Sequence, residues 1–325
     1  MAQARTRLSI VAPAFDEQEV LPHFHRELVA VLDALAVEYE CEIVYVDDGS
    51  RDATLGLLRG WAGADPRVRY LSFSRNFGHQ AAFTAGLEHA RGDVVVLLDA
   101  DLQHPPALIP DLLARWRLGA DVVRTVREPG RWNGRVGWGS RWFGRLFRWM
   151  SETPVADDVC DYCLLSRKAA DALLRLRETH RYLRGLVQWL GFPTAEVVFR
   201  PSPRRAGVSK FSPLRLANYG ADALLSFSRM PLRVAAFLGM IFVMIGLGIG
   251  VRAGVALLLC EEADLGWATL LGSVYVVGGA VLCGLGTVGE YVGRVYEQVK
   301  GRPLYLLKET EADLRANARA LPPAA

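Results

Sequence analysis

Two long runs without charged residues lie in the last third of the chain. The first covers residues 234–260 with one interruption, at Arg252, and the second covers residues 265–289. An α-helix rises about 1.5 Å per residue, so about 20 apolar residues cross the roughly 30 Å hydrocarbon core of a bilayer. A pair of buried helices in a soluble core is the alternative, but such helices rarely stay uncharged over this length. The runs therefore predict a transmembrane hairpin, with spans at 233–260 and 265–289.

Charges beside the two runs predict their orientation. The link at 261–264 contains three acidic residues. The outer flanks are basic and carry Arg215, Arg229, Arg233, Arg294, Lys300, Arg302 and Lys308. By the positive-inside rule, basic flanks stay in the cytoplasm. We therefore expect an integral protein of the plasma (inner) membrane with two spans and both termini in the cytoplasm, including a tail at 290–325.

The segment at 211–232, before the first span, combines apolar residues at helical spacing with basic ones. Its apolar residues are Leu214, Ala217, Ala221, Leu224 and Leu225, bracketed by Pro213 and Pro231. Such a pattern is typical of a helix that lies in the membrane interface. An amphipathic helix packed on the soluble part of the chain stays an open alternative.

The first 210 residues alternate short β-branched runs with longer amphipathic ones. Strands are predicted at 8–11, 42–46, 68–73 and 94–98. Helices are predicted at 17–37, 53–62, 80–90 and 106–118. This alternation predicts an α/β domain over 1–210, with a Rossmann-like, mainly parallel sheet covered by helices. Ligands of such domains bind at the carboxyl ends of the strands.

Charge and cysteine content argue against two classes of protein. The chain has 38 Lys and Arg against 35 Asp and Glu, a formal charge of +3. This balance does not suit a nucleic-acid binder that works by neutralising phosphates, so we expect no nucleic-acid partner. Five cysteines, an odd number, without a secretory signal peptide argue against a disulfide scaffold and for a reducing, cytosolic setting.

An acidic cluster follows the strand predicted at 94–98. It reads Asp99-Ala100-Asp101-Leu102-Gln103-His104, which places two carboxylates and an amide at alternate positions. Hard oxygen ligands such as Asp99, Asp101 and Gln103 suit Mg²⁺ or Mn²⁺ that also binds a diphosphate. An Asp-x-Asp pair alone is common without a metal, and its place at a strand end is what favours a metal site.

Two other predicted strands also end in polar or aromatic residues. They are followed by Asp47 and Asp48 in one case, and by Pro13, Phe15 and Glu17 in the other. Carboxylates held at a strand end suit the N–H edge of a base or a ribose hydroxyl, and an aromatic ring can border the same base. We expect these residues to form a nucleotide pocket, with Asp99 beside the metal or on the ribose.

These segments, in this order, resemble the donor half of inverting family 2 glycosyltransferases, which have a GT-A-type fold. The run Phe73-Ser74-Arg75-Asn76-Phe77-Gly78-His79-Gln80, and later runs at 178–187 and 205–211, are similar to motifs of the polyprenyl-phosphate glycosyltransferases. That group includes dolichol-phosphate mannose synthases and bactoprenol glucosyltransferases. The resemblance covers residues 7–308, including the predicted hairpin.

The resemblance implies a UDP- or GDP-sugar as donor, an undecaprenyl or dolichyl phosphate as acceptor, and inversion at the anomeric carbon. It adds Asn76 to the donor site, gives Asp101 a catalytic role as metal ligand, and makes Asp161 the candidate carboxylate near the acceptor. Asp161 stands in Cys160-Asp161-Tyr162, where the group has Gly-Asp-Phe. The lone pair Cys160 and Cys163 cannot complete a zinc site.

Arginines alternate with aromatic residues between Arg124 and Arg148. Guanidinium groups bind phosphate oxygens in pairs, and aromatic rings suit the membrane interface. We therefore expect a site for a lipid phosphate here, although a headgroup-facing position stays open for each single arginine. The predicted acceptor residues are Arg127, Arg131, Ser140, Arg141, Arg205 and Lys210.

Together these features predict a membrane-bound enzyme that moves a sugar to a polyprenyl phosphate at the cytoplasmic face. A processive polysaccharide synthase is one alternative, but the chain lacks the Gln-x-x-Arg-Trp motif of that class, and two spans are few for a polymer channel. A non-catalytic nucleotide-binding scaffold is another, but it would not need the acidic cluster and the arginine loop together. A homo-oligomer stays open.

Overall fold

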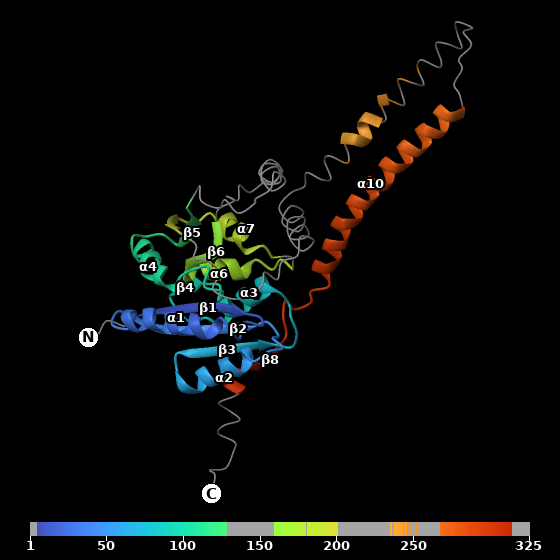
Figure 1. Cartoon of the computed structure of the whole chain (residues 1–325). Helices are drawn as coiled ribbons and strands as arrows, with labels where there is room; N and C mark the ends of the chain where they lie inside the picture. The colour runs from blue at the N-terminus through green and yellow to red at the C-terminus, as the bar shows by residue number, and fades with distance from the viewer. Residues whose placement is uncertain are drawn as a thin grey trace, which may run out of the picture. The chain divides into compact units, whose positions relative to one another are not determined.

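The computed structural model describes residues 5–128, 159–179, 181–200 and 267–313, together with 235, 237–242, 244–245, 248 and 251 (Figure 1). The chain divides into two compact units. One unit contains Met1–Arg145, Thr153–Leu216 and Pro303–Ala325, and the other contains Leu146–Glu152 and Ala217–Arg302.

The first unit is built on a sheet of eight strands in the order β7-β5-β6-β4-β1-β2-β3-β8. The strands are β1 (Thr6–Ala14), β2 (Tyr39–Asp47), β3 (Val68–Phe73), β4 (Val94–Leu97), β5 (Val122–Arg127), β6 (Val159–Ser166), β7 (Thr194–Phe199) and β8 (Leu307–Thr310). Strand β1 is parallel to β2 and β4, β2 is parallel to β3, and β5 is parallel to β7. Strands β6 and β8 are antiparallel to their neighbours. The predicted α/β fold with a mainly parallel, GT-A-like sheet is confirmed.

Helices connect the strands. They are α1 (Leu21–Leu35), α2 (Thr54–Ala64), α3 (His79–His89), the 3₁₀ turn η1 (Pro106–Leu108), α4 (Ile109–Arg117), α6 (Arg167–Arg175) and α7 (Leu183–Trp189). The helix predicted from residue 17 begins only at Leu21, because Asp16 has a left-handed φ of 51° and Pro22 occupies the first turn. Proline is favoured there, since its missing N–H would have no partner in the helix.

Alternate residues of β1 face opposite layers of helices. Leu8 and Ile10 belong to a buried core shared with α1, α2 and α4. Val11 faces α3, and a Cβ built on Gly86 of that helix would lie 2.2 Å from Val11 Cγ1. Glycine at position 86 therefore lets α3 pack directly on the sheet. Burial on both faces explains why the parallel strands have continuous apolar runs.

Strand β8 lies at the end of the described chain and completes the sheet beside β3. The predicted cytoplasmic tail at 290–325 therefore does not form one segment, because residues 303–313 pack with the sheet. A soluble domain ending at residue 210 would lack this strand. The sequence Leu307-Lys308-Glu309-Thr310 has no apolar alternation that could have predicted it.

The second unit contains α10 (Trp267–Val299). Among the described residues, Val276–Val299 of this helix is the one segment long and apolar enough to cross a membrane. Helix α10 begins close to the predicted start of the second span at 265 and continues beyond its predicted end at 289. Residues 237–242 within the predicted first span are helical. Most of that span, the link at 261–264 and the segment at 211–232 lie outside the described residues.

Candidate active site

The loops after β1 and β2 are joined by hydrogen bonds at the carboxyl edge of the sheet. Ser50 Oγ accepts a hydrogen bond from the Asp16 backbone N–H at 3.0 Å, and Asp16 Oδ1 accepts one from the Arg51 N–H at 2.7 Å. Thr54 Oγ1 accepts a hydrogen bond from the Glu17 N–H at 2.9 Å. Phe15 and Glu17 are half-buried in this loop pair, and Pro13 is buried in β1. The predicted nucleotide residues of these two strands thus lie at one edge of the sheet, in segments that hydrogen bonds join.

Asp47 and Asp48 are almost fully buried at the end of β2, with 1% and 3% exposure. Asp47 accepts hydrogen bonds from Ser72 Oγ at 2.7 Å and from the Ser50 N–H at 2.9 Å. Asp48 accepts hydrogen bonds from the N–H groups of Phe77 at 2.7 Å and Gly78 at 3.0 Å. Both carboxylates hold the loops around the pocket, and their contact with a base stays a prediction.

Burial makes Asp48 a weaker acid than a free aspartic acid. It raises the pKa of that carboxyl to about 6, although the N–H donors of Phe77 and Gly78 oppose the shift. The loop that these donors belong to also carries Asn76, which is exposed. Gly49 packs against the backbone of this loop. It has a φ of +72°, and a Cβ on Gly49 would lie 2.5 Å from the Arg75 carbonyl carbon. The loop over Asp48 can approach this closely only because residue 49 is glycine.

Asp99 lies between two imidazoles directly after β4. His79 Nε2 is 3.0 Å from Asp99 Oδ1, and His104 Nδ1 is 3.4 Å from Asp99 Oδ2. Burial alone would raise the pKa of Asp99, but the two histidines outweigh it and hold the pKa well below its usual range. Desolvation likewise opposes the charge of His104, yet its bonds to Asp99 and Cys160 raise its pKa to about 9. Asp99 is therefore held as a carboxylate.

Asp161, on β6, joins the same centre. It forms a two-bond ion pair with Arg184 of α7, with Nε to Oδ1 and Nη2 to Oδ2 both at 2.7 Å. One ligand atom from each of His79, Asp99 and Asp161 lies within 4.8 Å of the others. Asp99 Oδ1 is buried, and its 3.0 Å contact with His79 Nε2 does not have the angles of a hydrogen bond. Two carboxylates and an imidazole around such an atom fit a divalent cation, and the imidazole suits Mn²⁺ better than Mg²⁺.

The other members of the acidic cluster have a different place. Asp101 Oδ1 accepts a hydrogen bond from the backbone N–H of Gln103 at 3.0 Å, and Leu102 between them has a left-handed φ of 60°. Asp101 and Gln103 are half-buried in this tight turn. Within the described part of the chain, the group of possible ligands around Asp99 includes Asp161 and His79 and does not include Asp101.

Three residues of this centre were not predicted as site residues. His79 begins α3, His104 is the last residue of the acidic cluster, and Arg184 is the second residue of α7. All three stand inside the runs that carry the family resemblance, which is the signal that could have found them. The thiol of Cys160 lies beside His104, which lowers the pKa of the thiol although burial opposes this.

The predicted acceptor site is only partly covered by the described residues. Arg127 ends β5 and is half-buried. Outside the described residues lie Arg131, Ser140, Arg141, Arg205 and Lys210. A pocket beside Asp161 is lined by Phe83, Leu97, Arg124, Cys160, Asp161, Cys163, Leu183, Arg184 and Val187. The apolar side chains of this pocket, which are Phe83, Leu97, Leu183 and Val187, therefore lie beside the charged centre.

Comparison with known proteins gives one consistent result. The sequence pattern of the glycosyl transferase family 2 domain matches residues 9–174. The chain is 36% identical over 305 residues to the SfII prophage-derived bactoprenol glucosyl transferase of Shigella flexneri, covering 94% of this chain and 98% of that one. It is 35% identical over 306 residues to the prophage bactoprenol glucosyl transferase homolog of Escherichia coli strain K12, covering 94% and 99%.

A looser likeness links the fold to a mannosyl-3-phosphoglycerate synthase from Rubrobacter xylanophilus, with 18% identity, a TM-score of 0.47, and 68% and 73% coverage. That likeness does not bear on the assignment, which rests on the family domain and on the two relatives. Both relatives match over nearly their whole length, so the similarity extends beyond the donor domain. The chain belongs to glycosyl transferase family 2, within the group that contains the bactoprenol glucosyl transferases.

Proposed function

We propose that the enzyme transfers a sugar from a nucleotide-diphosphate sugar to a polyprenyl phosphate at the cytoplasmic face of the membrane. The observation that carries this proposal is the centre of His79, Asp99 and Asp161 at the carboxyl edge of a family 2 sheet, in a chain that also contains the apolar helix α10. The names of the relatives favour a bactoprenol phosphate as acceptor and glucose as the sugar. UDP-glucose is therefore the first donor to test, followed by GDP-sugars.

The centre fits a divalent metal, Mg²⁺ or Mn²⁺, held by Asp99 and Asp161 with His79. Asp101 and Gln103 lie in the adjoining turn and are proposed as further ligands toward the diphosphate. Such an ion offsets the negative charge that builds up on a departing diphosphate. Arg184 fixes Asp161 through two hydrogen bonds, which orients this carboxylate toward the centre.

The acceptor needs little activation, because a lipid phosphate is already ionised near neutral pH. Catalysis then depends on positioning and on charge stabilisation. We propose that the phosphate is bound by Arg127, Arg131, Ser140, Arg141, Arg205 and Lys210. Direct attack of its oxygen on the anomeric carbon would invert the configuration there.

The proposed topology has two spans and both termini in the cytoplasm. Its support is the apolar helix α10, the first uncharged run at 234–260, and the acidic link between them. The donor domain would then face the compartment in which nucleotide sugars are made.

The decisive experiment uses the purified full-length chain in liposomes with undecaprenyl phosphate and a panel of UDP- and GDP-sugars. We expect one sugar to be transferred to the lipid, and we expect EDTA to abolish the product. The control variant is Asp171→Asn, which removes an exposed carboxylate on α6 that pairs with Arg167. It should transfer the sugar as the wild type does. A polymeric product would indicate a polysaccharide synthase. Absence of transfer from every donor would contradict the proposal.

A further inference from the structure

The segment at 303–311, which we call the C-terminal strap, is bound to the outer edge of the catalytic sheet. Its strand β8 pairs with β3 in the register Leu71 with Thr310 and Ser72 with Glu309. The pairing continues past the end of the strand, where the Ser74 N–H donates a hydrogen bond to the Leu306 carbonyl at 2.9 Å. Ser74 begins the loop that ends at His79.

Side chains reinforce this pairing. Glu309 accepts two hydrogen bonds from Arg59 of α2, at 2.7 and 2.6 Å, and one from the Tyr70 hydroxyl at 3.2 Å. The Tyr305 ring stacks on Phe73 with ring centroids 4.9 Å apart and planes within 15°. A bidentate guanidinium–carboxylate pair is stronger and more directional than an ordinary surface ion pair. The strap is therefore a specific partner of β3 and not a loosely placed tail.

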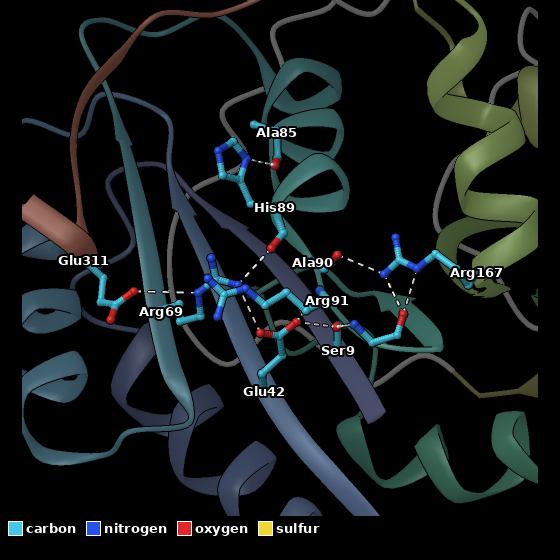
Figure 2. A network of polar contacts seen from close by, with 10 residues as sticks. Ser9, Glu42, Arg69, Ala85, His89, Ala90, Arg91, Arg167 and Glu311 are labelled. Carbon is cyan, nitrogen blue, oxygen red and sulfur yellow. Dashed lines mark hydrogen bonds and ion pairs between the residues drawn. The ribbon is translucent and has the colours of Figure 1, made fainter. Parts of the chain in front are cut away.

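Two contacts extend from the strap to the carboxyl end of α3. The Tyr305 hydroxyl hydrogen-bonds to Glu88 in the last turn of that helix. Glu311 lies 3.7 Å from Arg69 Nε, and Arg69 Nη1 donates to the His89 carbonyl at 2.8 Å (Figure 2). The last carbonyls of a helix have no partner within the helix, so a bond from Arg69 fixes its end.

The amino end of α3 lies at the active site. His79, its first residue, contacts Asp99, and the N–H of Gly78 before it is held by Asp48. Between the two ends, residues 81–87 are buried and Gly86 presses α3 against β1. An α-helix of 11 residues is a stiff rod about 16 Å long. A displacement at its carboxyl end is therefore transmitted to His79.

We infer that the C-terminal strap positions α3, and through it His79 against Asp99. Tyr305 and Glu309 are positioning residues, because Tyr305 contacts Phe73 and Glu88, and Glu309 contacts Arg59 and Tyr70, and none of these belongs to the centre. The inference rests on the proposed function for its effect on turnover. In the sequence the strap follows α10 after only Lys300, Gly301 and Arg302, so the apolar helix leads directly into the segment that aligns the donor site.

The test compares Tyr305→Phe and Glu309→Gln with the wild-type full-length chain in liposomes. Tyr305→Phe removes one hydroxyl and keeps the ring stacked, so it preserves folding. Losing a hydrogen bond to a charged partner raises the equilibrium constant for local opening about tenfold. We expect hydrogen exchange within α3 to rise about tenfold in both variants, while exchange within α1 stays the same.

Turnover with UDP-glucose and undecaprenyl phosphate gives the second reading. We expect kcat to fall about tenfold with a change in donor KM of less than about twofold, since a misplacement of about 1 Å can cost on the order of 100-fold in rate. The double variant Arg59→Glu with Glu309→Arg exchanges the two charges. It should recover most of the kcat that Glu309→Gln loses. Arg7→Gln is the matched control, because the exposed pair of Arg7 and Glu40 lies away from the strap.

A strap that only covers the edge of β3 would give another result. Both variants would then lower the unfolding temperature and leave α3 exchange and kcat unchanged, which would overturn the inference. A wild-type chain that transfers no sugar from any donor would overturn the proposed function instead. The exchange measurement needs no substrate, so it still decides the role of the strap in that case.

Discussion

The two ends of the same sheet differ in the charged groups that they gather. Toward the amino ends, side chains join neighbouring segments: Arg167 donates to the Gly92 and Ala90 carbonyls, and Ser9 Oγ accepts from the Gly92 N–H at 2.7 Å and donates to Glu42 at 2.6 Å (Figure 2). At the carboxyl ends, some carboxylates also bind backbone N–H groups, as Asp48 does, but Asp99 lies between the imidazoles of His79 and His104.

The amino end of the sheet therefore has a structural role, and the carboxyl end carries the candidate active site. At the amino end, bonds such as those of Arg167 to the Gly92 and Ala90 carbonyls fix a connection between two elements. A carboxylate between imidazoles has a strongly shifted pKa and keeps lone pairs for a cation, which is typical of functional sites. Substitutions at the two ends should therefore have different consequences.

The largest effect is expected for Asp99→Asn. Removing this charge takes away the centre of the proposed metal site, and we expect transfer to fall by a factor on the order of 1,000. The free energy of unfolding should fall as well, because the buried His104 loses its charged partner, so transfer is compared per folded molecule. Transfer assays and thermal unfolding measure the two quantities.

Asp101→Asn, measured in parallel, tests the neighbouring turn, where Asp101 also bonds to the Gln103 N–H. A loss as large as that of Asp99→Asn would place Asp101 on the metal. Near-normal transfer by Asp99→Asn would contradict the assignment of the carboxyl edge as the active site.

Gly92→Ala tests the opposite end. A Cβ at this position would lie 2.5 Å from Ser9 Oγ and 2.7 Å from the Ser9 backbone nitrogen. Backbone cannot yield as a flexible side chain does, so we expect a loss of about 1–3 kcal/mol in the free energy of unfolding. Activity per folded molecule should stay close to that of the wild type. A stable variant with little activity would break the proposed separation.

Gly86→Ala should combine both effects, since α3 links the two ends. The added methyl group meets Val11 Cγ1, which we expect to cost about 1–2 kcal/mol and to lower kcat severalfold as α3 shifts. The double variant with Val11→Ala removes the obstructing methyl groups and should recover activity more than stability. Failure of this rescue would show that the loss comes from elsewhere than the contact between α3 and β1.

The smallest effect concerns pH and Glu309. Hydrogen bonds from Arg59 hold the pKa of this carboxyl below its ordinary value, although burial opposes them. The stabilisation is therefore fully present above a pH of about 4.5 and is lost as the pH falls through the lowered folded-state pKa. The difference in unfolding temperature between wild type and Glu309→Gln should shrink on acidification from pH 6 to pH 3.5. A constant difference would exclude this titration.

Strands and helices were predictable where local pattern decides them. Strand β3 was predicted with its observed bounds, and β1, β2 and β4 within a few residues, because buried parallel strands have continuous apolar runs. Strand β8 was not, because its stability comes from Glu309 and Arg59, which are 250 positions apart. No short stretch of the sequence contains both residues.

The candidate site was also predictable only where neighbouring residues decide it. Asp99 was predicted from its place at a strand end, and Asp161 from resemblance alone. His79 was missed because its role appears only when the start of α3 is brought next to the end of β4. The metal was predicted from neighbouring residues of one loop, whereas the structure brings together residues from three elements.

Strand β8 also has a consequence for how the enzyme is made. Ribosomes add about 5–20 residues per second, so the segment that separates Arg59 from Glu309 takes roughly 10 to 50 seconds to synthesise. During this interval β3 is a bare edge whose unpaired N–H and C=O groups invite pairing with other nascent chains. A premature stop before Leu307 leaves the described active-site residues in the product and this edge uncovered, so synthesis of Leu307–Thr310 is what completes the sheet.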